Sequence, residues 1–289
     1  MNGLHSGYAI AANPVIADRS ILTPEALEFA GELVAAFRER IADLLTTRRM
    51  QRRRVEAGER PLPLESTSWN READWQCAPV ASDLLDRPGT IAGPADRQSI
   101  ARAVKSGCAM YVAQLEDGAV TMSEAQSTLR DAVHGDLPLS DVKSRRGRRT
   151  LPTFVLRPRP LEATDGHLFL NRRPVPAALV DAALFLFHNA SALVAEGERP
   201  YFYLADVQSY QEARLWNDIF LFAEAQLALP IGTIKATVRI ATSAAALQMN
   251  EILYALRRHS AGLHGLLLDS SREALVETCR RRGVPARVM

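Results

Sequence analysis

Three stretches of this sequence decide its fold: TFVLRPR at residues 153–159, YFYLADV at 201–207 and IKATVRIAT at 234–242. Each is a short apolar run that ends at a charged or polar residue and is followed by a segment of helical periodicity. Flat apolar runs of this length suit parallel strands that are buried on both faces. AMYVAQLED at 109–117 and GLLLDS at 265–270 fit the same pattern. The sequence therefore predicts an α/β fold, a TIM-type (β/α) barrel that is incomplete, because a closed barrel needs eight strands and about five are predicted here.

The residues that close these runs define a candidate site. In barrels of this type, catalytic residues lie at the carboxyl ends of the strands. The side chains at those ends are therefore expected to share one rim. The predicted rim consists of Glu116, Asp117, Arg157, Arg159, Asp206, Ala241 and Asp269.

Length and composition are those of a globular protein with a sizeable core. The chain has 289 residues, of which 47% are hydrophobic and 24% are charged, enough for a domain of roughly 200 residues with an appendage. A net charge of +2 is too small to indicate a polyanionic partner. The arginine clusters at 48–54 and 144–149 are not interleaved with aromatic residues, so we expect solvated surface there and no nucleic-acid partner.

The sequence also gives expectations for location and covalent chemistry. Cys77, Cys108 and Cys279 are odd in number and widely spaced, which indicates neither a disulfide framework nor a zinc site. No basic segment followed by an apolar core opens the sequence, and no apolar run reaches 18 residues. We therefore expect a cytoplasmic protein without a membrane partner.

The first part of the chain differs from the β/α series. Thr23 can cap a helix that has Pro24 at its first position, and apolar residues then recur at helical spacing to about Thr47. We predict an N-terminal helical segment and arm over 1–94 and a partial barrel over 95–289.

Several short words in the second half of the chain stand at a fixed spacing. They are HNA at 188–190, PYFYL at 200–204, EARLWND at 212–218, GTIKAT at 232–237, EIL at 251–253 and HSAGL at 259–263. In these words and their separations the chain resembles the malate synthases of the shorter, A-type class. The resemblance implies an N-terminal helical clasp, a (β/α)8 barrel and a C-terminal helical domain. These 289 residues match the clasp and part of the barrel, and the C-terminal domain is expected to be absent.

That family is a group of C-acetyltransferases of the glyoxylate cycle, which condense acetyl-CoA with glyoxylate to give malate and CoA. The reaction needs a carboxylate base for the methyl proton, a cation for the enolate oxygen, and magnesium to present glyoxylate. By resemblance, Arg157 in LRPRP is the catalytic arginine. Glu116 and Asp117 are supporting acids, while Gln114 replaces an aspartate of the family's ADFEDS word.

The resemblance also implies a weakened metal site. The family's IET word carries a glutamate ligand where this chain has Ala241, and Asp269 occupies the position of the second ligand. A methyl group cannot bind magnesium, so metal affinity should fall. His264 replaces a family asparagine. The family's catalytic base is an aspartate of the C-terminal domain, and no residue of this chain is expected to serve as the base.

Two functions of different classes remain open at this stage. The chain is either a malate-synthase-type enzyme or a catalytically inactive remnant or interaction protein of that family. A weaker alternative is a CoA-thioester lyase on the same barrel. In the non-catalytic case, the apolar edge of the predicted fifth strand would be exposed and would favour self-association.

Overall fold

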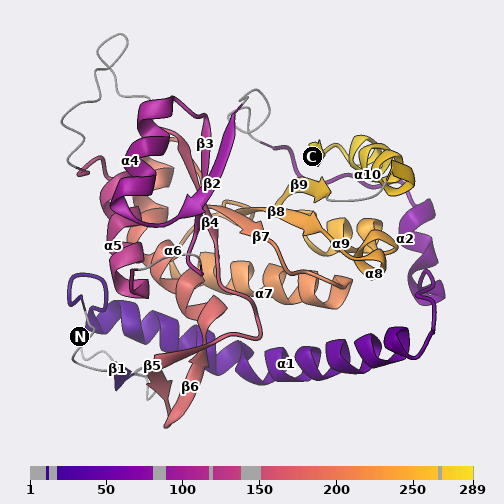
Figure 1. Cartoon of the computed structure of the whole chain (residues 1–289), viewed down its shortest axis with the longest axis horizontal. Helices are drawn as coiled ribbons and strands as arrows, with labels where there is room; N and C mark the ends of the chain where they lie inside the picture. The colour runs from indigo at the N-terminus through magenta and orange to yellow at the C-terminus, as the bar shows by residue number, and fades with distance from the viewer. Residues whose placement is uncertain are drawn as a thin grey trace. The chain divides into compact units, whose positions relative to one another are not determined.

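A computed structural model describes residues 11–12, 18–80, 89–116, 120–137, 151–265 and 269–288 (Figure 1). The chain divides into two compact units. Unit 1 contains residues 1–36 and 87–202, and unit 2 contains residues 37–86 and 203–289. Helix α1 (Pro24–Glu56) contributes residues to both units.

Unit 1 is built on parallel strands with helices between them. Its strands follow the order β2 (Thr90–Pro94), β3 (Met110–Gln114), β4 (Thr153–Arg157) and β7 (Tyr201–Leu204), the last two residues of β7 belonging to unit 2. Its helices are α4 (Arg97–Ser106), α5 (Met122–Val133) and α6 (Ala177–Ala195). The side chain of Asp96 caps α4, and Thr121 and Glu124 form a capping box at the start of α5.

Helix α6 is the apolar centre of unit 1. Most of its residues are buried, as expected of a helix that is hydrophobic all round. Among the described helices it alone is long and apolar enough to cross a membrane, but 72% of that window is buried within the protein. The buried Gln126 side chain of α5 donates a hydrogen bond to the carbonyl oxygen of Asp181, with an N···O distance of 3.0 Å, which fixes α5 against α6.

A small antiparallel sheet, in the order β1 (Ala11–Ala12), β5 (Thr164–Leu170) and β6 (Arg173–Pro176), completes unit 1. Asn171 and Arg172 form the two-residue loop between β5 and β6, with φ values of 53° and 61°. Positive φ at both loop residues is typical of the hairpin turns whose twist matches that of the strands.

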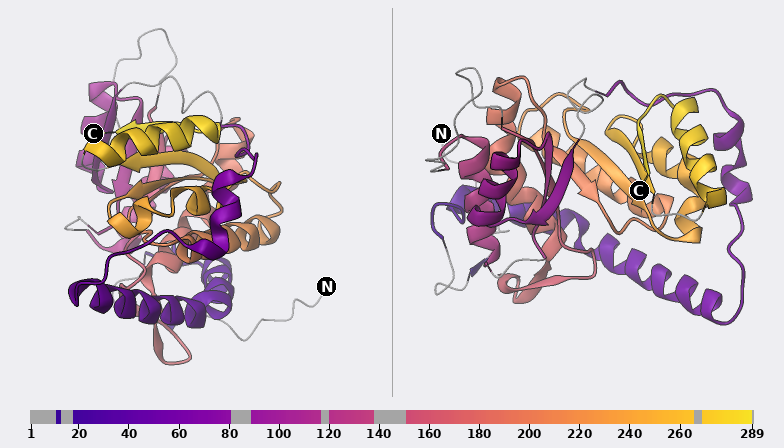
Figure 2. Two further views of the ribbon diagram at one scale, coloured as in Figure 1. Left: turned by 90° about the vertical axis from the view of Figure 1, so that its right-hand side faces the viewer. Right: turned by 45° about the horizontal axis from the view of Figure 1, so that its top comes forward.

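Unit 2 continues the same alternation. Its parallel strands follow the order β7, β8 (Lys235–Ile240), β9 (Ser260–Gly265) and β10 (Ala286–Val288). Its helices are η1 (Glu65–Thr67), α2 (Ser68–Glu72), α7 (Tyr210–Gln226), α8 (Ser243–Ala246), α9 (Met249–Ala255) and α10 (Asp269–Arg281). Figure 1 shows α2 beside α9, and Figure 2 shows α10 alongside β9. The predicted α/β fold of the TIM-barrel type is confirmed.

Some predicted elements are corrected by the structure. The fifth strand was predicted at 265–270, but β9 is Ser260–Gly265, Asp269 begins α10, and residues 266–268 lie outside the described residues. The predicted exposed edge of that strand was also wrong, because β10 pairs with β9 through Ala286 and Leu263. Strand β2 was not predicted, since its sequence TIAGP contains glycine and proline.

A buried arginine joins the end of α10 to the segment around α2. The guanidinium of Arg282 donates hydrogen bonds to the carbonyl oxygens of Asn70, Arg71, Ala73 and Trp75 and to the side-chain oxygen of Asn250. It also lies 4.0 Å from the centre of the Trp75 ring. Arg282 is completely buried. The positive charge of Arg282 is therefore stabilised by peptide carbonyls, and none of the hydrogen-bond acceptors named here carries a negative charge.

We expect Arg282→Met to lower the free energy of unfolding by roughly 3 kcal/mol, because several buried carbonyl acceptors lose their donor. Chemical denaturation monitored by circular dichroism measures this. Arg280→Met is the matched control, because Arg280 is exposed and pairs with Glu277 three residues away; it should leave the midpoint unchanged. Equal effects of the two variants would contradict the role given to Arg282.

Candidate functional site

Arg157 ends strand β4 in unit 1. The pairing of β3 with β4 sets Gln114 directly opposite Arg157. The Nη2 atom of Arg157 forms an ion pair with Oε1 of Glu116, and the two side chains are 18% and 25% exposed. The structure thus brings together two of the predicted rim residues. Asp117, the other predicted acid, lies outside the described residues.

Arg159 has a different environment from Arg157. Its guanidinium contacts Asp181 at 2.6 Å and Asp165 at 2.9 Å, and both carboxylates are buried. Burial disfavours the charge of Arg159, but the two carboxylates outweigh it and raise its pKa. We conclude that Arg159 holds the β4–β5 connection to α6 and is a structural residue.

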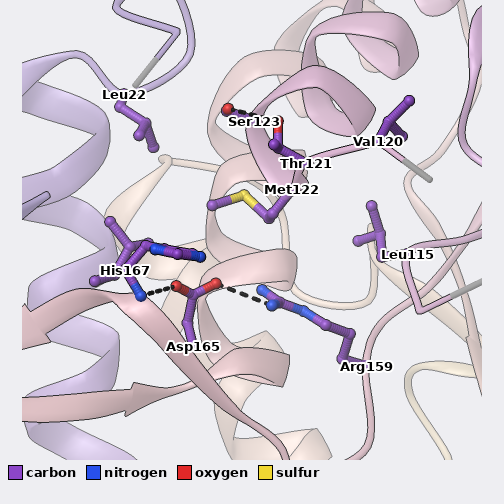
Figure 3. A pocket seen from close by; sticks show the side chains of 10 residues that line it. Leu22, Leu115, Val120, Thr121, Met122, Ser123, Arg159, Asp165 and His167 are labelled. Carbon is purple, nitrogen blue, oxygen red and sulfur yellow. Dashed lines mark hydrogen bonds and ion pairs between the residues drawn. The ribbon is translucent and has the colours of Figure 1, made fainter. Parts of the chain in front are cut away.

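A cavity of about 230 Å³ lies beside these residues in unit 1 (Figure 3). Figure 3 shows Arg159 and Asp165 linked on one side, with Leu115 and Val120 above them and Leu22 and His167 across the space. The remaining lining residues of the cavity are Thr121, Met122, Ser123 and Leu168. Leu115 directly precedes Glu116 in the chain. The cavity is therefore lined by apolar and polar side chains in equal measure, and Leu115 connects its wall to Glu116 along the chain.

The predicted metal position lies in unit 2, after strand β8. Ala241 is exposed there and presents a methyl group. The side chain of Asp269, the predicted second ligand, is outside the described residues, although its backbone begins α10. Within the described ranges, no three histidine, cysteine or acidic side chains are grouped as metal ligands would be.

Arg239 is the charged residue nearest in sequence to Ala241 on β8. Its Nε atom donates a hydrogen bond to the carbonyl oxygen of Ala205 at 3.0 Å, and its Nη2 atom lies 3.8 Å from Oδ1 of Asp206. A guanidinium in this place repels a divalent cation. The donor set at the end of β8 therefore does not fit magnesium.

His264 lies on β9, where its Cα pairs with that of Arg239 on one side and that of Arg287 on the other. The hydroxyl of Tyr203 and Nδ1 of His264 are 2.6 Å apart. Burial, with the nearby Arg287 and Arg239, lowers the pKa of His264. The imidazole is accordingly neutral at neutral pH.

Two other histidines are structural. His259 is completely buried between Oδ1 of Asn217 at 3.0 Å and Oε2 of Glu224 at 3.1 Å. His188 lies 2.8 Å from the carbonyl oxygen of Ile21, and burial lowers its pKa. Both rings are held by neighbouring elements of their own unit.

Cys77 and Cys279 are both buried within unit 2. Cys279 is completely buried, and burial raises its pKa to about 12. Burial likewise raises the pKa of Cys77 to about 11. Helix α10 packs against β9. Cys279 is on its buried face, and the arginines of α10 are on its exposed face.

A thiol-labelling experiment tests these burial states. We expect Cys108, which is partly exposed, to react with a disulfide reagent at pH 8, while Cys77 and Cys279 react only after unfolding, because a buried thiol is neither ionised nor accessible. Cys108→Ser should remove the fast phase. Rapid labelling of Cys279 in the folded Cys108→Ser protein would show that the packing of α10 is wrong.

Comparison with known proteins points to one family. The family model described as malate synthase, TIM barrel domain, matches residues 153–287, and that of the malate synthase N-terminal domain matches residues 6–68. The malate synthase of Myxococcus xanthus is 43% identical over 250 residues, which cover 84% of this chain and 46% of that protein. Malate synthase A of Escherichia coli is 37% identical over 253 residues, which cover 86% and 48%.

The chain thus spans about half the length of the curated relatives it matches. Among solved structures, the malate synthase of Haloferax volcanii in a lead(II) complex superposes loosely, with a TM-score of 0.49 and 13% identity over 70% of this chain and 61% of that chain.

Proposed function

We propose that this chain, which belongs to the malate synthase family, acts on acetyl-CoA and glyoxylate at the carboxyl end of β4. The observation that carries the proposal is the ion pair of Arg157 with Glu116. In it, a guanidinium is held by a carboxylate at the end of a barrel strand, where the chemistry of such folds is located. Arg157 is also the position that the family resemblance assigns to the catalytic arginine.

The reaction explains why an anchored arginine is needed. A base takes a methyl proton of acetyl-CoA, and the electron pair of the broken C–H bond moves negative charge onto the thioester oxygen. By family resemblance that base is an aspartate of the family's C-terminal domain, and we assign the proton transfer to no residue of this chain. The resulting enolate carbon then forms a bond to the aldehyde carbon of glyoxylate, and water cleaves the thioester to give malate and CoA. A cation aimed at the thioester oxygen stabilises the charge as it develops, without reorganising during the reaction.

Glu116 is the positioning residue in this proposal. The carboxylate of Glu116 pairs with the Arg157 guanidinium, whose planar fork has a geometry that suits oxygen acceptors. The cavity lined by Leu115 and Arg159 lies in the same unit, and its mixture of apolar and polar side chains suits a ligand such as an acyl-CoA, which has both apolar and polar parts.

Magnesium is the cofactor that the family resemblance implies, and it would present glyoxylate as an electrophile. Ala241 and Arg239 do not fit that role, because they offer a methyl group and a cation at the end of β8. We therefore assign no step of the reaction to a metal.

A second candidate function is a non-catalytic member of the family that binds an acyl-CoA or associates with other chains. Ala241 favours this second candidate, because the family resemblance places a metal-binding glutamate at that position. The edge available for association differs from the one predicted. In unit 1, β2 is paired on the β3 side and exposes Ile91, so self-association would use this edge.

Release of free CoA from acetyl-CoA and glyoxylate, followed with a thiol reagent, tests both candidates. The enzyme proposal predicts glyoxylate-dependent release that falls by about 10²-fold or more in Arg157→Gln, as on removal of a charge-stabilising donor. Arg102→Gln, an exposed change on α4, is the control and should retain full turnover.

Binding of acetyl-CoA without turnover would favour the non-catalytic candidate. Turnover that is unaffected by Arg157→Gln would contradict the role of Arg157 in either case.

A further inference from the structure

We infer that a cavity between α2, α7 and α9 is a binding site for an organic ammonium ion that carries an apolar body. The cavity has a volume of about 420 Å³ and lies within unit 2, and that volume is in the range of small-molecule sites. None of its described lining residues belongs to a strand. The cavity is therefore separate from the strand ends considered above.

Two buried oxygen atoms mark this cavity as a site for a donor. Oε2 of Glu251 and Oδ1 of Asn70 are buried and accept no hydrogen bond from the part of the chain that the structure describes. Both residues line the cavity, and they are only 2% and 3% exposed. The chain is described without a gap over 18–80 and 151–265, so the segments around both residues are complete. Because a buried acceptor without a donor is destabilising, a donor from outside the chain is expected there.

The other oxygen of Glu251 is already engaged. Oε1 accepts a hydrogen bond from the hydroxyl of Thr67 at 3.0 Å and forms an ion pair with Nη1 of Arg71. These two contacts hold the carboxylate in place between the segment of α2 and helix α9. An ionised carboxylate has about four acceptor positions, so Oε2 can accept a donor that enters the cavity.

Aromatic rings form another part of the cavity wall. The rings of Trp69 and Tyr254 are 5.1 Å apart at an angle of 89°, and both residues line the cavity together with Tyr210. The guanidinium carbon of Arg257 lies 4.3 Å from the centre of the Tyr254 ring. Aromatic faces attract cations, and this cluster already holds one. Trp69 is 50% exposed, so a ligand can reach the wall from solvent.

An ammonium group fits these features better than an anion. It has three N–H donors and no acceptor, so one group can donate to Oε2 of Glu251 and to Oδ1 of Asn70. The contact with the carboxylate is charge-assisted, although Arg71 offsets part of that charge. A carboxylate or a phosphate has only acceptors and would leave both oxygens without a donor.

The apolar body of the ligand follows from the aromatic wall. Carbon atoms attached to the ammonium group would cover the exposed part of Trp69 and remove apolar surface from water. Free amines and amino acids share this ammonium chemistry. The two sources differ in the carboxylate that an amino acid also carries, and the probes below distinguish them.

Calorimetric titration of the whole chain tests the site, with phenethylamine and L-phenylalanine as ammonium probes and 3-phenylpropionate as a probe of similar shape that lacks the ammonium group. We expect both ammonium probes to bind and 3-phenylpropionate not to bind. Glu251→Gln should weaken ammonium binding by about 10-fold to 100-fold, the loss of a charge-assisted hydrogen bond. Glu277→Gln is the matched control, because it makes the same change at an exposed position of α10 in the same unit.

A second variant keeps the test decisive if Glu251→Gln does not fold. Trp69→Ala changes a half-exposed residue and should weaken ammonium binding by about 3-fold or more, because the cation loses an aromatic face. Thermal melting of each variant verifies that the fold is retained. Tighter binding of L-phenylalanine than of phenethylamine would assign the site to amino acids, and the reverse order would assign it to simple amines.

Three results would overturn the proposal. They are the absence of binding by both ammonium probes, equal binding of 3-phenylpropionate, and ammonium binding that is unchanged in a folded Glu251→Gln or Trp69→Ala variant. The absence of binding would mean that the two buried oxygens are satisfied by water alone.

These outcomes are independent of the proposed condensation. Ammonium binding is measured without acetyl-CoA and without turnover, so a chain that releases no CoA can still bind phenethylamine. Conversely, CoA release by a chain that binds neither ammonium probe would leave the role of Arg157 unchanged.

Discussion

The register of the parallel strands is the constraint on which both candidate sites depend. In unit 1, the pairing of β3 with β4 sets Gln114 opposite Arg157. In unit 2, the pairing of β8, β9 and β10 aligns Arg239, His264 and Arg287. Because side chains alternate between the two faces of a strand, a slip of one residue would turn each of these groups to the opposite face. The chemistry of the strand ends is therefore a consequence of pairing, and buried contacts that fix the pairing are part of each site.

Buried polar contacts fix that register in unit 2. The carboxylate of Glu224 accepts hydrogen bonds from the backbone N–H groups of Gly232 and Ile234, just before β8, and contacts His259, just before β9. Its side chain is completely buried. Further along, Gly262 of β9 approaches β10 so closely that an added Cβ would lie 2.1 Å from the carbonyl oxygen of Pro285. One carboxylate and one glycine thus fix where three strands begin.

The sequence predicted the parts of the fold that follow local rules. The strands at TFVLRPR, YFYLADV and IKATVRIAT were correct because their apolar runs are short and clearly bounded. The fifth strand was misplaced because β9 carries two glycines and a histidine, so that GLLLDS appeared the better strand. Arg282 and its carbonyl partners are separated by more than 200 residues, and no local pattern could reveal them. Arg239 was missed as well, although a charge near the end of an apolar strand was a usable signal.

The central claim is that the guanidinium of Arg239 occupies the end of β8, where the family resemblance predicts a metal. A crystal structure of the chain grown with oxalate and manganese, recorded at a wavelength where manganese scatters anomalously, tests it most directly. The account predicts Arg239 in contact with Ala205 and Asp206 and no anomalous peak near Ala241. A manganese peak beside Ala241, with oxalate bound to the metal, would contradict it.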